Sequence, residues 1–137
     1  MLLRLAMPTR NALAQVFQQQ IDAGGQGEIR VYAGAMPRSA DDEAERDNLL
    51  GVLTFASPSA GQSEDGELEF GAIAEEPAAR RTGSATWARI VDGAGETVFD
   101  VDVSDRSGDG VVRLNTVDIV VGGPIRLTRF VLGMPEG

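Results

Sequence analysis

The stretch TWARIVDGAGETVFDVDV, residues 86–103, decides the fold class of this chain. Two runs rich in β-branched and alternating apolar residues flank the four residues Asp92-Gly93-Ala94-Gly95. An Asp-Gly pair between two such runs is a strong signal for a β-hairpin, because glycine adopts the backbone angles that tight turns require. We therefore predict two antiparallel strands joined by a short turn.

The second run continues into FDVDVSDRSGDG, residues 99–110, which looks at first like a calcium-binding loop. An EF-hand loop needs glycine at its sixth position and a bidentate glutamate at its twelfth. Counted from Asp100, these positions hold Asp105 and Val111, so both requirements fail. The apolar residues between the aspartates share one strand face, so we expect Asp100 and Asp102 to face solvent and the glycines to supply a turn. We predict no metal site and no cofactor.

Upstream, PTRNALAQVFQQQIDAGG, residues 8–25, has the pattern of an amphipathic helix. Thr9 is a suitable N-cap, and Gly24-Gly25 provides the stop signal. The apolar residues Leu13, Val16, Phe17 and Ile21 recur at spacings of three and four, as one helical face requires. We predict a helix over about residues 9–23, after an N-terminal arm of residues 1–8, packed on the sheet or on a neighbouring subunit.

The remaining segments alternate with a period of two, or are apolar on both faces, which is typical of short strands. They are EIRVYAGAMP (28–37), LLGVLTFA (49–56), ELEFGAIA (67–74), VVRLN (111–115), VDIVV (117–121) and PIRLTRFVL (124–132). The alternation in the last segment changes phase between Leu127 and Phe130, which predicts a bulge. Because helices do not separate these strands, we predict one mainly β domain over residues 9–137. The expected architecture is a two-sheet antiparallel β-sandwich, jelly-roll-like, with one N-terminal amphipathic α-helix.

The composition excludes several kinds of chemistry. The 137 residues include no cysteine and no histidine, and all twelve basic residues are arginine. Thiolate nucleophiles, imidazole bases, Schiff-base lysines and Cys/His zinc sites are therefore impossible, and we do not expect an enzyme. A formal net charge of −9 would repel a phosphate backbone, so we expect no nucleic-acid partner. Because no apolar run is long enough to cross a membrane, we expect no membrane partner.

Several segments, taken together, resemble a family of small virion proteins of tailed bacteriophages. They are a helix that ends in DAGG, the segments IRVYAGAMP and LLGVLTFA, and the stretches TGSATWARIVDGAGETVFDVDVS (82–104) and LNTVDIVVGGPIRLTRFVLGMP (114–135). Members of this family resemble capsid cement, or decoration, proteins with a β-sandwich or jelly-roll fold. The resemblance implies a protein assembled in the host cytoplasm that lies on the outer surface of the capsid and binds the major capsid protein. It brings no catalytic residues.

The expected function is therefore to stabilise a phage head by bridging capsid subunits, as a homo-oligomer such as a dimer or trimer. Candidate partner-binding residues lie in the two terminal segments and in the adjacent basic pair: Leu2, Leu3, Leu5, Met7, Arg80, Arg81 and Met134. The apolar arm either binds a partner or packs on its own domain. The basic pair either binds a partner or is simply a solvated loop.

Two alternative functions stay open at this point. One is another position in the virion, such as a head–tail connector or a tail accessory protein. The other is a carbohydrate-binding module or a carboxylate hydrolase on a similar sandwich. One Trp, one Tyr and five Phe are few for a sugar-binding surface, which argues against the second alternative.

Overall fold

The structure is a computed structural model that describes residues 2–134. Within these residues one α-helix precedes a series of short strands, as the sequence predicts. The elements in chain order are α1 (Met7–Ile21), β1 (Glu28–Ala33), the 3-10 helix η1 (Arg46–Asn48), β2 (Leu49–Phe55), β3 (Glu67–Glu69), β4 (Ile73–Ala74), β5 (Gly83–Val91), β6 (Thr97–Asp105), β7 (Val112–Leu114), β8 (Asp118–Ile119) and β9 (Leu127–Gly133).

The predicted hairpin is confirmed and forms the centre of the sheet. β5 and β6 pair in antiparallel register, with Ala88 opposite Val101 and Ile90 opposite Phe99. β1 pairs with the other side of β5, and β2 pairs with the other side of β1. Ala88 and Ile90 are fully buried, because alternate side chains of a strand point to the same face and this face covers the core.

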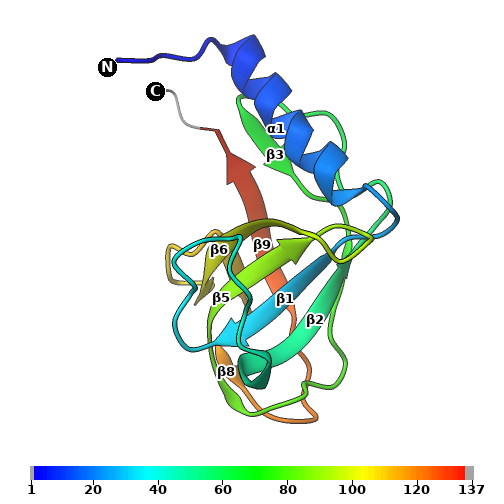
Figure 1. Cartoon of the computed structure of the whole chain (residues 1–137), viewed down its shortest axis with the longest axis vertical. Coiled ribbons are helices and arrows are strands. Elements are labelled where there is room, and N and C mark those ends of the chain that lie inside the picture. The colour runs from blue at the N-terminus through cyan, green and yellow to red at the C-terminus, as the bar shows by residue number, and fades with distance from the viewer. Residues whose placement is uncertain (1, 135–137) are drawn as a thin grey trace.

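The strands form one curled sheet in the order β3-β9-β7-β6-β5-β1-β2-β4, and β8 pairs with the start of β5 (Figure 1). The two edge strands, β3 and β4, are separated in the chain only by residues 70–72. Laid flat, eight strands would place these edges roughly 34 Å apart, whereas four residue steps span at most about 14 Å. The sheet must therefore curl into a half-barrel. The predicted mainly β fold is confirmed at this level, but a separation into two sheets is not.

Aromatic rings from three parts of the chain pack inside the curled sheet. The ring centroids of Phe55 on β2 and Phe70 after β3 are 5.1 Å apart, and those of Phe70 and Phe130 on β9 are 4.4 Å apart. All three residues are buried. Because burial of a Phe side chain contributes roughly 1.5–3 kcal/mol, this cluster stabilises the contact between the two flanks of the sheet.

Residues 106–111 bring the chain back alongside the strand it has just left, so β7 pairs with β6 in parallel. Two glycines make this close return possible. A Cβ on Gly110 would lie 2.5 Å from the backbone nitrogen of Ser104, and a Cβ on Gly108 would lie 2.6 Å from the Ser104 Cβ. The segment that looks like a calcium loop is therefore a return loop. The parallel pair that it creates departs from the predicted all-antiparallel arrangement.

Helix α1 starts and ends earlier than predicted. The N-cap is Ala6, which makes no side-chain capping hydrogen bond, and the expected cap Thr9 lies inside the first turn. Pro8 fits this turn because the first backbone N–H groups of a helix have no partner within the helix. The expected arm of residues 1–8 is correspondingly shorter, since its last two residues are helical.

The face of α1 that packs on the protein also differs from the predicted one. The helix contacts β3 and β6. It buries Ala14 and Ile21 and partly buries Phe17, whereas Leu13 and Val16 are exposed. The predicted apolar stripe is thus divided between the buried and the exposed sides of the helix. Where the helix lies close to β3, a small side chain such as that of Ala14 is enough to fill the contact.

Two strand predictions near β9 have different outcomes. The bulge is confirmed, because Leu114 pairs with Leu127 and Arg113 pairs with Arg129, which leaves Thr128 as the extra residue. The segment ELEFGAIA, predicted as one strand, forms β3 and β4 instead, with a turn of direction after Glu69. The two halves pair with different partners, β9 and β2, at opposite edges of the sheet.

Candidate interaction surfaces

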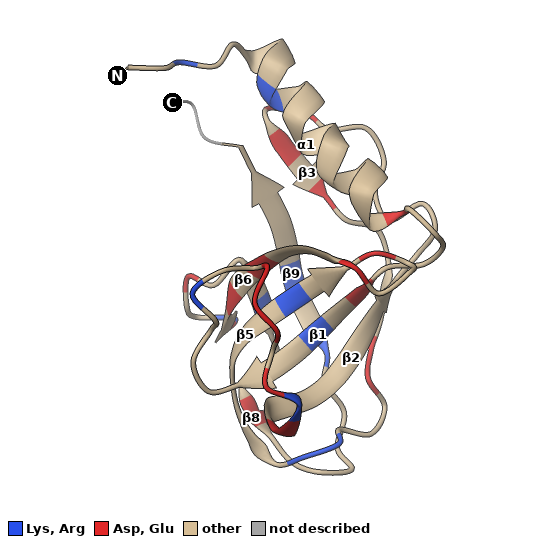
Figure 2. Ribbon diagram, viewed as in Figure 1, with Lys and Arg blue, Asp and Glu red and all other residues tan. Residues whose placement is uncertain are grey.

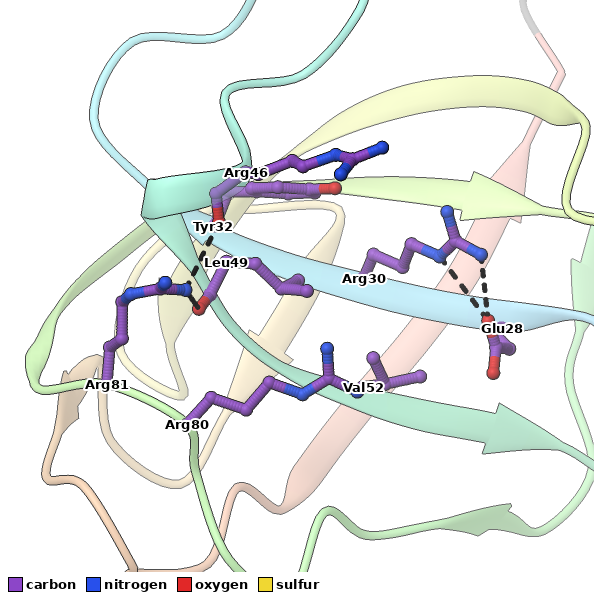
Figure 3. Close-up of a pocket in the computed structure, with 8 residues that line it drawn as sticks. All are labelled: Glu28, Arg30, Tyr32, Arg46, Leu49, Val52, Arg80 and Arg81. Atoms are coloured by element: carbon purple, nitrogen blue, oxygen red, sulfur yellow. Dashed lines mark hydrogen bonds and ion pairs between the residues drawn. The ribbon is translucent and has the colours of Figure 1, made fainter.

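The outer face of the central strands carries a stack of aromatic and guanidinium groups. The rings of Tyr32 and Trp87 lie 4.5 Å apart between centroids, with 12° between their planes. The guanidinium carbon of Arg89 lies 5.5 Å from the Trp87 ring centroid, and Arg46 lies alongside the Tyr32 ring (Figure 3). Tyr32 and Trp87 are buried although they do not face the main core. A stack of this kind holds its arginines in fixed positions.

Arg89 connects this face to the hairpin partner strand and to the acidic loop before η1, residues 38–45. Its Nε donates to Asp100 Oδ1 at 2.8 Å, and its Nη2 donates to Asp100 Oδ2 at 3.0 Å. Its Nη1 donates to the backbone carbonyl of Asp42 at 2.6 Å. The side chains of Arg89 and Asp100 are only 7% and 6% exposed. The hydrogen bond to Asp100 raises the pKa of Arg89 above its ordinary value.

The prediction that Asp100 faces solvent is therefore wrong, because the Asp100 carboxylate is buried in its pair with Arg89. Asp102 is exposed as predicted, and its Oδ1 accepts a hydrogen bond from the backbone N–H of Val111 at 2.9 Å. Asp105 accepts hydrogen bonds from the hydroxyl and the backbone N–H of Ser107, which lower the pKa of Asp105 below its ordinary value. Each of these aspartates stabilises local structure.

A hollow of about 570 Å³ opens on the outer face of β1 and β2, beside the stack (Figure 3). Its lining combines four arginines and one glutamate with a tyrosine and two aliphatic side chains. The lining residues are Glu28, Arg30, Tyr32, Arg46, Leu49, Val52, Arg80 and Arg81. A second hollow of about 420 Å³ shares Arg30, Tyr32 and Arg46 and extends toward Arg89. We call the first of these the arginine hollow.

The arginines of the arginine hollow differ in how they are paired. Arg30 contacts Glu28 at 3.2 Å. Arg81 donates to the backbone carbonyls of Arg46 and Leu49, and its distance to the nearest carboxylate oxygen, on Asp47, is 3.7 Å. Within residues 2–134, the guanidinium groups of Arg46 and Arg80 make no hydrogen bond or ion pair. The hollow therefore presents unpaired positive charge in a chain whose net charge is −9.

A separate apolar surface lies at the end of the molecule that carries α1 (Figure 1). Leu2 and Leu3 in the arm are 77% and 58% exposed, and Met7 in the first helical turn is also exposed. Leu13 and Val16 add exposed apolar area on the outer side of the helix. The alternative that the whole arm packs on its own domain is wrong for Leu2 and Leu3. We call this surface the apolar end.

The other two terminal candidates are less available to a partner. Leu5 is half-buried. Met134 packs against the core, and its backbone N–H donates to the carbonyl of Gly66 at 2.8 Å. The N–H of Gly66 in turn donates to the side chain of Asn11 on α1, so Met134 lies near the first half of the helix.

The structure thus separates the predicted partner-binding residues into two groups. Arg80 and Arg81 join Arg30 and Arg46 in the arginine hollow, whereas the terminal residues lie near α1. Arg30 and Arg46 were missed by the sequence reasoning. The available signal was the outward position of Arg30 beside Tyr32 on the predicted strand, but nothing in the sequence brings residues 46 and 80 near it.

Among residues 2–134, no group of three or more acidic, histidine or cysteine side chains is arranged to hold a metal ion. No helix in the same part of the chain is both long and apolar enough to span a membrane.

Comparisons of the chain with models of protein families, with curated proteins and with solved structures give no match. The functional conclusions therefore depend on the geometry of the two surfaces and on the resemblance carried by the sequence segments.

Proposed function

We propose that the protein is a virion structural protein of a tailed bacteriophage and acts as capsid cement. In this role it binds the outer surface of the major capsid protein and stabilises the head by bridging subunits. The observation that carries the proposal is the apolar end, where Leu2 and Leu3 are largely exposed in the single chain. The resemblance of several sequence segments to capsid cement proteins supports the choice of partner.

The energetics of the apolar end suit a docking surface. Burying one large aliphatic side chain against a partner contributes roughly 1.5–3 kcal/mol, before the loss of conformational entropy in the arm is subtracted. A stable protein interface buries about 1,600 Å² in total, which is more than the arm alone provides. Leu13 and Val16 on α1 would extend the contact. Modest contacts repeated around a closed shell act together, because opening the shell must break many of them at once.

The proposal includes action through surfaces alone, without catalysis, a cofactor or nucleic acid. It also includes the finer fold assignment, in which the curled sheet is a variant of a jelly-roll-like sandwich. Support for that assignment comes from Phe55 on β2 and Phe130 on β9, whose ring centroids lie 6.1 Å apart although their strands are distant in the sheet order.

The test measures co-sedimentation of the purified chain with capsids that lack it. The variant L2S/L3S is expected to bind at least about tenfold more weakly, a loss of about 1.4 kcal/mol. The matched control is V120S/V121S, because Val120 and Val121 are 62% and 58% exposed but follow β8, at the other end of the molecule (Figure 1). This control variant is expected to bind like the wild type.

Two outcomes would contradict the proposal. The first is wild-type binding by L2S/L3S with a loss of binding in the control variant. The second is a copy number per virion in the tens instead of the hundreds, which would indicate a head–tail connector or tail accessory protein. Particles assembled without the protein should also rupture at a lower temperature than complete particles.

A further inference from the structure

We propose that the arginine hollow is a self-association site that receives the acidic turn of a second copy of this chain. The acidic turn comprises Glu64, Asp65, Glu67 and Glu69 on and just before β3. The inference goes beyond the capsid role and does not depend on it, since it concerns contacts between identical chains.

The chemistry of the arginine hollow selects carboxylates. A guanidinium group binds a carboxylate through two parallel hydrogen bonds, which makes arginine well suited to recognising acidic side chains. The hollow offers two guanidinium groups without partners, those of Arg46 and Arg80. Leu49 and Val52 supply an apolar floor for the aliphatic stems of the incoming side chains. Arginine and tyrosine are both enriched at the centre of protein interfaces.

The acidic turn is rigid and exposed. Asp65 and Gly66 both have positive φ angles, 54° and 72°, in a tight turn closed by reciprocal backbone hydrogen bonds between Glu64 and Glu67. Asn11 on α1 fixes this turn by accepting a hydrogen bond from the Gly66 N–H at 2.6 Å. Little conformational entropy is therefore lost when the turn binds.

The carboxylates of the turn are also available for pairing. Within the described part of the chain, none of the four acidic residues of the turn makes an ion pair. Glu67 and Glu69 point to the exposed side of β3, with the buried Leu68 between them, so their Cα atoms are about 7 Å apart. β3 is an edge strand and leaves this row of carboxylates uncovered.

The two surfaces cannot meet within one molecule. The acidic residues of the turn lie at β3, beside α1, whereas the arginines of the hollow lie on β1, at η1 and in the segment just before β5, and further acidic residues lie in the loop that precedes η1 (Figure 2). Two complementary patches at different places on the same chain produce a head-to-tail contact, which closes into a ring when the rotation allows it. Copies with a net charge of −9 repel one another at long range, and placing opposite charges in contact offsets this repulsion.

The test uses sedimentation of the full chain at physiological salt over a hundredfold range of concentration. The wild type is expected to associate. The variants R46E/R80E and E67R/E69R are each expected to lose at least about tenfold in association. An equimolar mixture of the two variants is expected to associate again, because each then finds the opposite charge on the other. Circular dichroism confirms that the variants are folded, as is expected for changes at exposed residues.

The control variant D109R/D118R changes the net charge by the same amount as E67R/E69R, but at two exposed aspartates outside both surfaces, and it is expected to associate like the wild type. A wild-type chain that stays monomeric throughout would overturn the inference. Failure of the mixed variants to associate would also overturn it. The same holds if the wild type is a monomer whose hollow binds inorganic phosphate or a polyglutamate peptide. These results are independent of capsid binding, which the L2S/L3S variant tests separately.

Discussion

Replacing Arg89 by methionine removes the guanidinium that joins the central hairpin to the acidic loop, while keeping most of the aliphatic volume. The lost interactions are two hydrogen bonds to Asp100, at 2.8 and 3.0 Å, and one to the carbonyl of Asp42, at 2.6 Å. Asp100 is left with a side chain only 6% exposed and without its counter-charge. We therefore expect R89M to be strongly destabilised.

The magnitude follows from the burial of the pair. Removing one partner of a buried ion pair costs about 3–5 kcal/mol, because the other charge is left in a poorly solvated position. A domain of this size has a total stability of roughly 5–15 kcal/mol. With an unfolding entropy of about 2.1 cal/mol/K per residue, the loss corresponds to a decrease in Tm of roughly 10 to 17 °C.

The assay is urea unfolding, supported by thermal melts, with two comparison variants. R126M removes an arginine that forms an ion pair with Glu75, and the two side chains are 61% and 45% exposed. The expected loss in the free energy of unfolding is therefore below about 1 kcal/mol. R89M/D100L replaces both buried charges by apolar groups and should recover most of the stability, because no charge is then left unpaired. If R89M and R126M lose the same small amount, or if the double variant is no better than R89M, the reasoning about burial is refuted.

Three further predictions concern packing and charge. Gly93→Ala should lower the free energy of unfolding by more than about 1 kcal/mol, because the new Cβ would lie 2.5 Å from the carbonyl carbon of Gly24. Gly61→Ala is the control in the same urea assay. It should have almost no effect, because the space around Gly61 is open. Phe130→Ala should lose about 3–5 kcal/mol by leaving a cavity beside two other rings, and unchanged stability would mean that the half-barrel is not closed there. The lowered pKa of Asp105 means that its charged form stabilises the fold above the ordinary pKa of 3.8 and that this contribution disappears as the pH falls below it. Stability measured against pH should therefore show wild type and Asp105→Asn converging in acid, and a constant difference would contradict the assignment.

The features of this structure that depend on a few neighbouring residues could be predicted from the sequence. The hairpin, the bulge in β9 and the predominance of strands each depend on a few neighbouring residues. Helix α1 was predicted with displaced ends because Thr9 satisfies the capping rule in sequence, while the chain turns helical at Met7 with Ala6 as N-cap. Its buried side was only partly predicted, because the identity of the neighbouring strand β3 cannot be inferred from helical spacing.

Long-range features were not predictable in the same way. The parallel pairing of β6 and β7 depends on the return loop, in which glycines lie against Ser104. The arginine hollow combines side chains from four separate segments, and only Arg80 and Arg81 were identified as candidates. Asp100 alternates like a solvent-facing residue, and it is buried through its pair with Arg89, which also donates to the carbonyl of Asp42, more than fifty residues before Asp100. The exposure of Leu2 and Leu3 answers a question that the apolar pattern alone left open.

The pairing of β3 with β9 has a consequence for the order in which the chain can fold. The platform beneath α1 includes β3, and within the described chain β3 pairs only with β9, the last described strand in chain order. The contact between α1 and β3 therefore depends on a strand more than one hundred residues further along the chain, whereas Phe17 is also covered by Phe99 on β6. A chain cut before β9 would leave β3 without its partner strand and the adjoining part of the helix less covered, and proteases can recognise such an exposed segment.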